Sequence, residues 1–197
     1  MLRRELRAAR RALSDDERAA RSAACIDRLV ALLTPFPATV IGGFSPLAGE
    51  LELRPAFQRL LALGHTMALP RMQGETRPLV FHVYKEGDPL IIGGFRVAEP
   101  SAEAPVVRPR VVLVPLLGFD RHGHRLGYGK GYYDRTLLNL RTDDPELLAL
   151  GIGFALQEVP RVPTHAGDQP LDAVVTEQET VTVTPALDPA GTGPPHR

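Results

Sequence analysis

Apolar residues in the first part of the chain recur with a helical period. From Leu2 to Leu13 they return every three or four positions with arginines between them, which predicts one amphipathic helix. Ser14 and Glu17 then stand three residues apart, ahead of a further helical pattern. This spacing is that of a capping box, and it predicts a second helix from Ser14 to about Leu33. We therefore expect two helices at the N-terminus.

The rest of the chain carries short apolar runs, which are typical of strands. The predicted strands are residues 39–44, 66–70, 79–84, 111–116, 147–154, 173–177 and 181–184. Helical patterns separate several of them, one from Pro55 to Leu63 with Gly64 after it and one over 132–140. Strands that alternate with helices predict an α/β fold, here a three-layer αβα arrangement with a mainly parallel central sheet. The turn-rich segment 89–100 leaves its strand content open.

Length and composition bound the number of domains and the kind of partner. With 197 residues, of which 44% are hydrophobic, the chain fits one compact α/β domain, which we place at 1–184. Residues 185–197 are rich in Pro, Gly and Ala without periodicity and are predicted to form a disordered tail. The 23 Lys and Arg residues balance the 23 Asp and Glu residues, so a general binder of nucleic acid or of an anionic membrane is not expected.

Hydropathy and cysteine usage predict the compartment. The chain has no apolar run long enough to span a bilayer, and its N-terminus lacks a hydrophobic signal core. The single cysteine, Cys25, lies in a helical pattern and cannot form an internal disulfide, which is typical of a reducing compartment. We therefore expect a cytoplasmic protein, and a monomer.

One segment, RLGYGKGYYDR at 125–135, carries candidate chemistry. It follows the strongest predicted strand and precedes a helix, a place where open α/β sheets bind ligands. Gly127, Gly129 and Gly131 allow positive φ angles and a close approach of backbone N–H groups to an anion. Lys130, one of only two lysines, would add a mobile charge, and Arg125 can bind a phosphate through two hydrogen bonds. The following helix would add the positive end of its dipole.

Spacing alone does not decide whether this segment binds a phosphate. A Walker A loop needs a glycine five residues before Gly129, where the chain has His124, and a Ser or Thr after Lys130, where it has Gly131. The dinucleotide fingerprint fails as well, because the glycines alternate. A phosphate-binding loop and a glycine-rich structural turn packed with core tyrosines both stay open on these grounds.

Three carboxylates and two histidines are further candidates. Asp134 and Asp168 are the best residues for Mg²⁺, which typically takes one or two carboxylates together with substrate phosphates and waters. A helix-capping role for Asp134 and a turn role for Asp168 are the alternatives. Glu50 follows a predicted strand at a comparable end of the sheet, and a solvated loop carboxylate is its alternative. His122 and His124 have a spacing seen in some metal sites, but we expect exposed loop residues.

A longer stretch around the glycine segment, VLVPLLGFDRHGHRLGYGKGYYDRTL, runs from an apolar strand ending in Pro through G-x-x-F-D to R-L-G-x-G-x-G-Y-Y-D. This pattern closely resembles the signature of 5-formyltetrahydrofolate cyclo-ligases. LRRELRAARRALS is similar to the N-terminal helix of that family, GGFSPLAGELEL to its strand and acidic folate loop, and VPTHAGDQPLDAVVTE to its closing segment. The resemblance spans nearly the whole chain, to about Glu177.

This resemblance implies a ligase that depends on ATP and Mg²⁺. It would convert 5-formyltetrahydrofolate to 5,10-methenyltetrahydrofolate and release ADP and phosphate. Phosphorylation of the formyl oxygen would create a good leaving group, after which N10 of the folate closes the ring. The protein would mainly position the two reactants and neutralise the charge of the phosphates. The partners would be ATP and the folate, with or without a polyglutamate tail. A diverged relative that binds nucleotide or folate without turnover is the alternative, whereas the balanced charge argues against an RNA-associated relative.

The resemblance also implies roles for individual residues. Lys130, Arg125 and Glu50 would be catalytic, and Asp134 and Asp168 would bind the metal. The implied ATP-binding residues are Arg3, Arg125, Leu126, Gly127, Tyr128, Gly129, Lys130, Gly131, Tyr132 and Tyr133. The implied substrate-binding residues are Ser45, Glu50, Tyr128, Gly129, Lys130, Gly131 and Tyr132.

The N-terminus departs from the family's pattern. Relatives begin K-x-x-L-R, with the Lys and Arg reaching ATP, whereas here Leu2 and Arg3 match L-R and the lysine would fall before Met1. A start further upstream, the loss of one cation at ATP, and a substitute within the segment from Arg3 to Arg7 are the alternatives. We expect Arg3 to act in the usual register.

Overall fold

The computed structural model describes residues 1–183, which include both predicted N-terminal helices. The predicted tail, 185–197, lies outside the described residues. The α-helices of the described part are α1 (Leu2–Arg11), α2 (Asp15–Leu33), α3 (Arg54–Ala62) and α4 (Tyr132–Asp143). None of the helices within residues 1–183 is long and apolar enough to cross a membrane.

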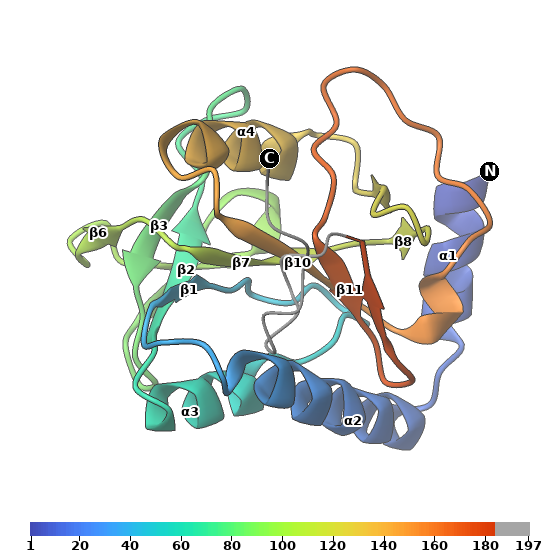
Figure 1. Ribbon diagram of the computed structural model, residues 1–197, viewed down its shortest axis with the longest axis horizontal. Coiled ribbons are helices and arrows are strands. Elements are labelled where there is room, and N and C mark those ends of the chain that lie inside the picture. The colour runs from blue at the N-terminus through green and yellow to red at the C-terminus, as the bar shows by residue number, and fades with distance from the viewer. Residues whose placement is uncertain (184–197) are drawn as a thin grey trace, which may run out of the picture.

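The boundary between α1 and α2 is set by the predicted capping box. The Ser14 hydroxyl accepts a hydrogen bond from the Glu17 N–H at 3.2 Å, and the Glu17 carboxylate accepts one from the Ser14 N–H at 2.9 Å. Both partners therefore satisfy N–H groups that the first turn of a helix leaves without backbone acceptors. The chain can turn sharply here, so that α1 and α2 lie in different parts of the molecule (Figure 1).

The central sheet has eight strands in the order β12-β11-β10-β7-β1-β2-β3-β6. These are β1 (Val40–Gly42), β2 (Thr66–Arg71), β3 (Val80–Val83), β6 (Val106–Val107), β7 (Val111–Pro115), β10 (Leu148–Ile152), β11 (Ala173–Val175) and β12 (Thr180–Thr182). The five strands from β11 to β2 pair in parallel, and the pairs toward each edge are antiparallel. The predicted mainly parallel sheet is confirmed.

Helices cover both faces of this sheet, as a three-layer fold requires. α2 and α3 lie below the sheet and α4 lies above it in Figure 1. Leu29, Phe57 and Leu113 belong to the apolar cluster on the α2/α3 side. Phe81 and Leu137 belong to the cluster under α4. The α1 helix stands at one end of the sheet, where Leu6 packs with Leu126, Val159 and Val162.

The order of connections places a switch point between β1 and β7. From β1 the chain passes through α3 to β2 on one side, and from β7 it passes through α4 to β10 on the other. Because β1 and β7 are parallel neighbours, with Ile41 opposite Val111, their carboxyl ends open side by side. A crevice outside such strand ends is where open α/β sheets bind ligands.

The structure differs from the prediction mainly in strand bounds and in one segment left open. The runs 39–44 and 147–154 keep only inner residues in the sheet, and the run 173–177 keeps its first three. Residues 89–100 form a separate hairpin of β4 (Leu90–Ile92) and β5 (Ala98–Pro100) around a short 3₁₀ turn, Gly94–Arg96. A second small hairpin, β8 (Gly118–Phe119) with β9 (Arg125–Leu126), follows β7. A 3₁₀ turn, Ala155–Gln157, follows β10.

Candidate functional site

The hairpin after β7 is held by a buried carboxylate, Asp120. This side chain is fully buried and accepts hydrogen bonds from the backbone N–H groups of His122, His124 and Val162. Burial raises the pKa of Asp120, but the hydrogen bonds outweigh burial and leave the pKa below its usual value. His122 is exposed, as predicted, whereas His124 is half-buried, with its Nδ1 3.1 Å from Oδ2 of Asp120. The turn fixes where β9 delivers the glycine segment.

The glycine segment 127–131 leads directly into α4. Gly129 has φ +93° and Gly131, the N-cap residue of α4, has φ +66°. Gly127 does not adopt a positive φ, so only two of the three glycines use the freedom that we expected for all of them. Gly131 has no side chain that could cap the first turn of α4. The N–H groups of that turn, and the positive end of the dipole of this 12-residue helix, therefore remain available to an anion.

Arg125 and Asp134 form an ion pair behind this segment. The Nη2 of Arg125 lies 2.8 Å from Oδ1 of Asp134, and both side chains are largely buried. The same Oδ1 accepts the N–H of Gln169 at 3.1 Å. Burial lowers the pKa of Arg125, and the negative charge of Asp134 opposes that effect. The structure thus pairs Arg125 with Asp134, and a direct contact of Arg125 with phosphate stays a prediction.

Asp168 follows in the segment that Gln169 ties to Asp134. The carboxylate of Asp168 accepts the backbone N–H of His165 at 2.9 Å and lies 3.0 Å from the His165 Nε2. The Oδ2 of Asp134 lies 4.0 Å from the position that a Cβ on Gly131 would occupy. Within residues 1–183, no cluster of three or more His, Cys, Asp or Glu residues is arranged to hold a metal. Binding of Mg²⁺ by Asp134 and Asp168, with phosphates and waters completing its shell, stays a prediction.

Glu50 lies in the loop after β1 and is buried against the glycine segment. Only 9% of the residue is exposed. Its Oε1 accepts a hydrogen bond from the Tyr128 hydroxyl, and its Oε2 accepts the backbone N–H of Leu47 at 2.8 Å. Burial raises the pKa of Glu50, while these hydrogen bonds and the charge of Arg10 act in the opposite direction. Glu50 is therefore a buried, positioned group and not a solvated loop carboxylate.

The arginine face of α1 covers the same segment. The Nε of Arg3 donates to the Gly127 carbonyl at 2.9 Å, and the guanidinium of Arg7 lies 5.3 Å from the centre of the Tyr128 ring. One further turn along, Arg10 donates from Nη2 to the Tyr128 hydroxyl at 3.2 Å. Arg3 was a predicted site residue, whereas Arg10 was not predicted. The signal available was its spacing, three residues after Arg7 on one helical face.

Lys130 is exposed at the outer end of the segment, next to the hairpin of β4 and β5. Its Nζ lies 5.4 Å from the centre of the Phe95 ring, and that ring meets Tyr132 edge-on at a centroid distance of 6.1 Å. Phe95 has φ +54°, an uncommon conformation for a bulky residue. The Ser45 hydroxyl donates to the Ala98 carbonyl at 2.6 Å and joins the loop after β1 to this hairpin. Phe95 was not predicted, because the strand content of its segment was open.

The decisive comparison is with sequence families. The model of the 5-formyltetrahydrofolate cyclo-ligase family matches residues 1–177. The chain belongs to this family. The cyclo-ligase of Escherichia coli (strain K12) is 30% identical over 176 residues, which cover 87% of this chain and 96% of that protein. The cyclo-ligase of Haemophilus influenzae is 31% identical, with 62% of this chain and 67% of that protein covered.

Solved structures agree with the cyclo-ligase assignment. The NMR structure of the 5,10-methenyltetrahydrofolate synthetase of Aquifex aeolicus has a TM-score of 0.75 and 28% identity, covering 99% of this chain and 95% of its own. The synthetase of Mycoplasma pneumoniae has a TM-score of 0.73 and 25% identity, covering 89% and 96%. The predicted family, fold and enzyme class, a ligase, are confirmed.

Hydrogen bonds and an ion pair join several of the residues implied by the cyclo-ligase pattern: Glu50 with Tyr128, Arg3 with Gly127, and Arg125 with Asp134. Two of the implied residues, Leu126 and Tyr133, have side chains that pack into apolar clusters. Leu126 is buried in the cluster with Leu6, and Tyr133 packs into the apolar cluster under α4, where burial raises its pKa. Their side chains therefore support the segment, and only the backbone of Leu126 is placed to contact a ligand.

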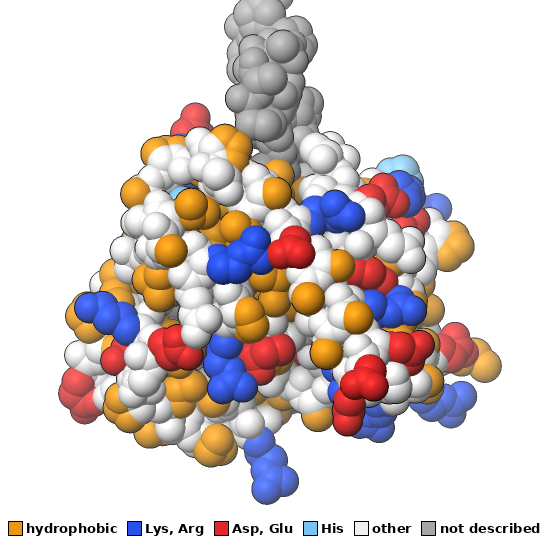
Figure 2. All heavy atoms as spheres, turned by 90° about the horizontal axis from the view of Figure 1, so that it is seen from below, with side chains coloured by type: hydrophobic (Ala, Val, Ile, Leu, Met, Phe, Trp, Pro, Cys, Tyr) orange, Lys and Arg blue, Asp and Glu red, His pale blue; other side chains and the backbone are white. Residues whose placement is uncertain are grey.

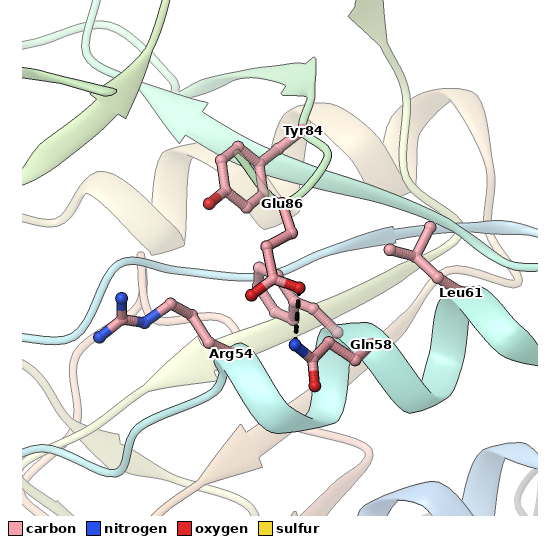
Figure 3. Close-up of a pocket in the computed structure, with 6 residues that line it drawn as sticks. Arg54, Gln58, Leu61, Tyr84 and Glu86 are labelled. Carbon is pink, nitrogen blue, oxygen red and sulfur yellow. Dashed lines mark hydrogen bonds between the residues drawn. The ribbon is translucent and has the colours of Figure 1, made fainter. Parts of the chain in front are cut away.

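Two concave features lie on the α2/α3 side of the cyclo-ligase fold. A cavity of about 10 Å³ between α3 and the end of β3 is spanned by a hydrogen bond from Gln58 to Glu86 at 2.6 Å (Figure 3). Its volume is that of about one water molecule. A groove of about 440 Å³ lies on the face formed by α2 and α3, where charged and apolar side chains alternate (Figure 2). Glu50 lines this groove, together with Ile26 and Pro55.

Proposed function

We propose that the chain is an ATP- and Mg²⁺-dependent ligase that converts 5-formyltetrahydrofolate to 5,10-methenyltetrahydrofolate with release of ADP and phosphate. Membership of the cyclo-ligase family supports this reaction. The single observation that carries it is the hydrogen bond from Tyr128 of the glycine segment to the buried carboxylate of Glu50. A nucleotide at the segment and a folate at Glu50 would lie side by side, as transfer between them requires.

The reaction has two steps in this proposal. The formyl oxygen attacks the γ-phosphorus of ATP, the bond to the bridging oxygen breaks, and ADP leaves. N10 of the folate then attacks the activated formyl carbon, the carbon–oxygen bond breaks with release of phosphate, and N10 gives up its proton. Both steps need aligned reactants and balanced negative charge, and neither needs a protein nucleophile.

Cationic side chains and backbone N–H groups would bind the phosphates in this reaction. The N–H groups from Gly127 to Gly131 and the uncapped first turn of α4 would bind phosphate oxygens. Lys130 is exposed and would contact the transferred phosphoryl group, and Arg3 lies at the Gly127 carbonyl. Arg125 would hold Asp134 and add its charge on the phosphate side. The proposed nucleotide contacts are Arg3, Arg125, Gly127, Tyr128, Gly129, Lys130, Gly131, Tyr132 and the backbone of Leu126, while Tyr133 supports the segment from the apolar cluster under α4.

The folate would occupy the side that Glu50 and Ser45 line. The Glu50 Oε2 accepts only one hydrogen bond among the described residues, from Leu47, so it retains capacity for an N–H group of the substrate. Tyr128 and Tyr132 border both ligands in this arrangement. The proposed folate contacts are Ser45, Glu50, Tyr128, Gly129, Lys130, Gly131 and Tyr132.

Asp134 and Asp168 are the proposed magnesium residues. The Oδ2 of Asp134 lies close to Gly131, at the end of the segment where phosphates would lie. Bound Mg²⁺ would neutralise phosphate oxygens. Arg125 and the Gln169 N–H hold the other oxygen of Asp134, so the carboxylate has one fixed orientation. A cytoplasmic location and a monomeric state stay predictions.

The test is to measure both products together. Purified protein with 5-formyltetrahydrofolate and Mg-ATP should form the near-ultraviolet absorbance of the methenyl product and one ADP for each product molecule. Calorimetric binding of nucleotide or folate without ADP release would replace the proposal with a non-catalytic binding protein. ADP formed in the absence of folate would indicate a simple ATPase.

A further inference from the structure

Arg10 is the buried arginine of α1, and its position is unlike that of the other arginines on this helix. Only 5% of the residue is exposed, whereas Arg3, Arg4, Arg7 and Arg11 are exposed. Burial of a guanidinium away from water is costly unless a negative partner lies close. The partner here is Glu50, whose Oε1 lies 3.6 Å from Nη1 of Arg10.

Tyr128 forms hydrogen bonds with both Arg10 and Glu50, so the three side chains form a triad. Its hydroxyl accepts a hydrogen bond from Nη2 of Arg10 at 3.2 Å and donates its own proton to Oε1 of Glu50. The Nε of Arg10 is also buried and has no hydrogen-bond partner among residues 1–183. The triad joins three segments that are distant in the chain: the end of α1, the loop after β1 and the glycine segment.

The triad leaves one face of Glu50 available. Arg10 and Tyr128 both act on Oε1, while Oε2 accepts only the Leu47 N–H at 2.8 Å among the described residues. A carboxylate oxygen can accept a second hydrogen bond. The two groups at Oε1 therefore fix the orientation of the carboxylate and direct Oε2 to a ligand.

We propose that Arg10 is a positioning residue that keeps Glu50 an oriented anion for the folate and couples it, through Tyr128, to the glycine segment that binds the nucleotide. This inference rests on the proposed function. Arg10 touches neither reactant, and it acts through Glu50. Loss of its charge should make Glu50 accept a proton more readily, because the carboxylate would then be buried beside a neutral phenol.

Other charged groups face Glu50 less closely. Tyr133 of α4 interacts with it electrostatically, and Arg7 lies over the far side of the Tyr128 ring. The charged residues that line the adjoining groove are Asp15, Arg18, Asp27, Glu52 and Arg59. Arg18 pairs with Asp15, and Arg59 pairs with Asp27, so these cations are already engaged. Arg10 is therefore the cation whose removal changes the charge balance at Glu50 most.

The experiment compares Arg10→Met and Arg10→Lys with Arg11→Met, a matched change at the exposed neighbour. The pH profile of kcat/KM for 5-formyltetrahydrofolate is measured for each. In Arg10→Met the acidic limb should move to higher pH by at least about one pH unit, which lowers kcat/KM about tenfold at the foot of the limb. Arg10→Lys should lie between this variant and the wild type, because lysine keeps the charge but not the fork geometry. Arg11→Met should follow the wild type.

A second measurement separates this inference from the proposed function. In the ligand-free protein, the ¹³C resonance of the Glu50 carboxyl, assigned with Glu50→Gln, should titrate at higher pH in Arg10→Met than in the wild type. A wild-type protein without cyclo-ligase activity would overturn the proposed function, and the titration would still decide whether Arg10 controls Glu50. Superimposable titrations and pH profiles in wild type and Arg10→Met would overturn the inference, as would an equal loss at every pH. If Arg10→Met does not fold, Arg10→Gln, which also removes the charge, carries the same comparison, and an unshifted Glu50 titration in that variant would overturn the inference.

Discussion

Gly129 offers a test of the glycine segment in which backbone strain can be isolated. Its φ is +93°, and the nearest heavy atoms to a Cβ built there belong to Arg3, at 4.0 Å. Gly129→Ala therefore meets no steric clash with a neighbour, and its cost is that of placing an L-residue at positive φ. Gly127 provides the control, because it lacks a positive φ and a Cβ there has no neighbour within 4 Å.

The expected loss of unfolding free energy follows from comparing Gly129→Ala with Gly127→Ala. Each change to alanine restricts the unfolded chain equally, which stabilises the folded protein by about 0.4–1 kcal/mol where the native φ is compatible. This contribution cancels in the difference between Gly129→Ala and Gly127→Ala. What remains is the cost of the left-handed conformation for a residue with a Cβ, about 1–2 kcal/mol. Gly129→Ala should be less stable than Gly127→Ala by that amount.

Urea unfolding followed by circular dichroism measures the difference directly. The slope of the unfolding free energy against urea concentration should be equal in both variants, so that the midpoints report stability. Equal free energies of unfolding, or a more stable Gly129→Ala, would refute the positive φ at Gly129. If the segment binds ATP, the KM for ATP should also rise in Gly129→Ala, because the backbone would shift to relieve the strain and would move its N–H groups.

Three further predictions concern single side chains. Lys130→Ala should lower kcat by about 10²–10³-fold without loss of stability, because one charge at the transferred phosphoryl group is removed. Lys85→Ala, at the only other lysine, should match the wild type. Equal kinetics in both variants would contradict the role of Lys130. Asp120→Asn should cost about 1.5–3 kcal/mol near neutral pH. Since the pKa of Asp120 is lowered in the folded state, this cost should shrink as pH falls through that pKa, and a cost independent of pH in urea unfolding would be evidence against it. Burial raises the pKa of Cys25 to about 12, so its thiol should react with an aromatic disulfide at about pH 8 only after unfolding, and rapid labelling of the native protein would contradict its burial.

The periodic parts of the fold could be predicted because local chemistry determines them. The capping box of Ser14 and Glu17 forms in both directions, and the apolar runs of β7 and β10 pair with each other at the centre of the sheet. The hairpin at 89–100 could not be predicted, because Ile91 and Ile92 are exposed on it and so carry no burial pattern. Its turn also depends on a bulky residue, Phe95, at positive φ, for which the sequence has no signal.

The site was only partly predictable, because its key contacts join distant segments. The glycine segment and Glu50 became candidates because each follows a predicted strand, and the family pattern implied their roles. Arg10, in contrast, lies 118 residues from Tyr128 and resembles the other arginines on the polar face of its helix. Arg125 was expected at the phosphates, but its nearest anion is Asp134, nine residues on. Such pairings follow from the packing of α1 and α4 around the ends of β1 and β7, which periodicity alone does not reveal.

The central claim is tested most directly by one absorbance measurement. Wild-type protein is mixed with 5-formyltetrahydrofolate and Mg²⁺, and the near-ultraviolet absorbance is followed before and after ATP is added, with an active cyclo-ligase as positive control. We predict no change before ATP and a steady rise of the methenyl absorbance after it. A flat trace after ATP addition, while the control enzyme is active under the same conditions, would contradict the proposed function.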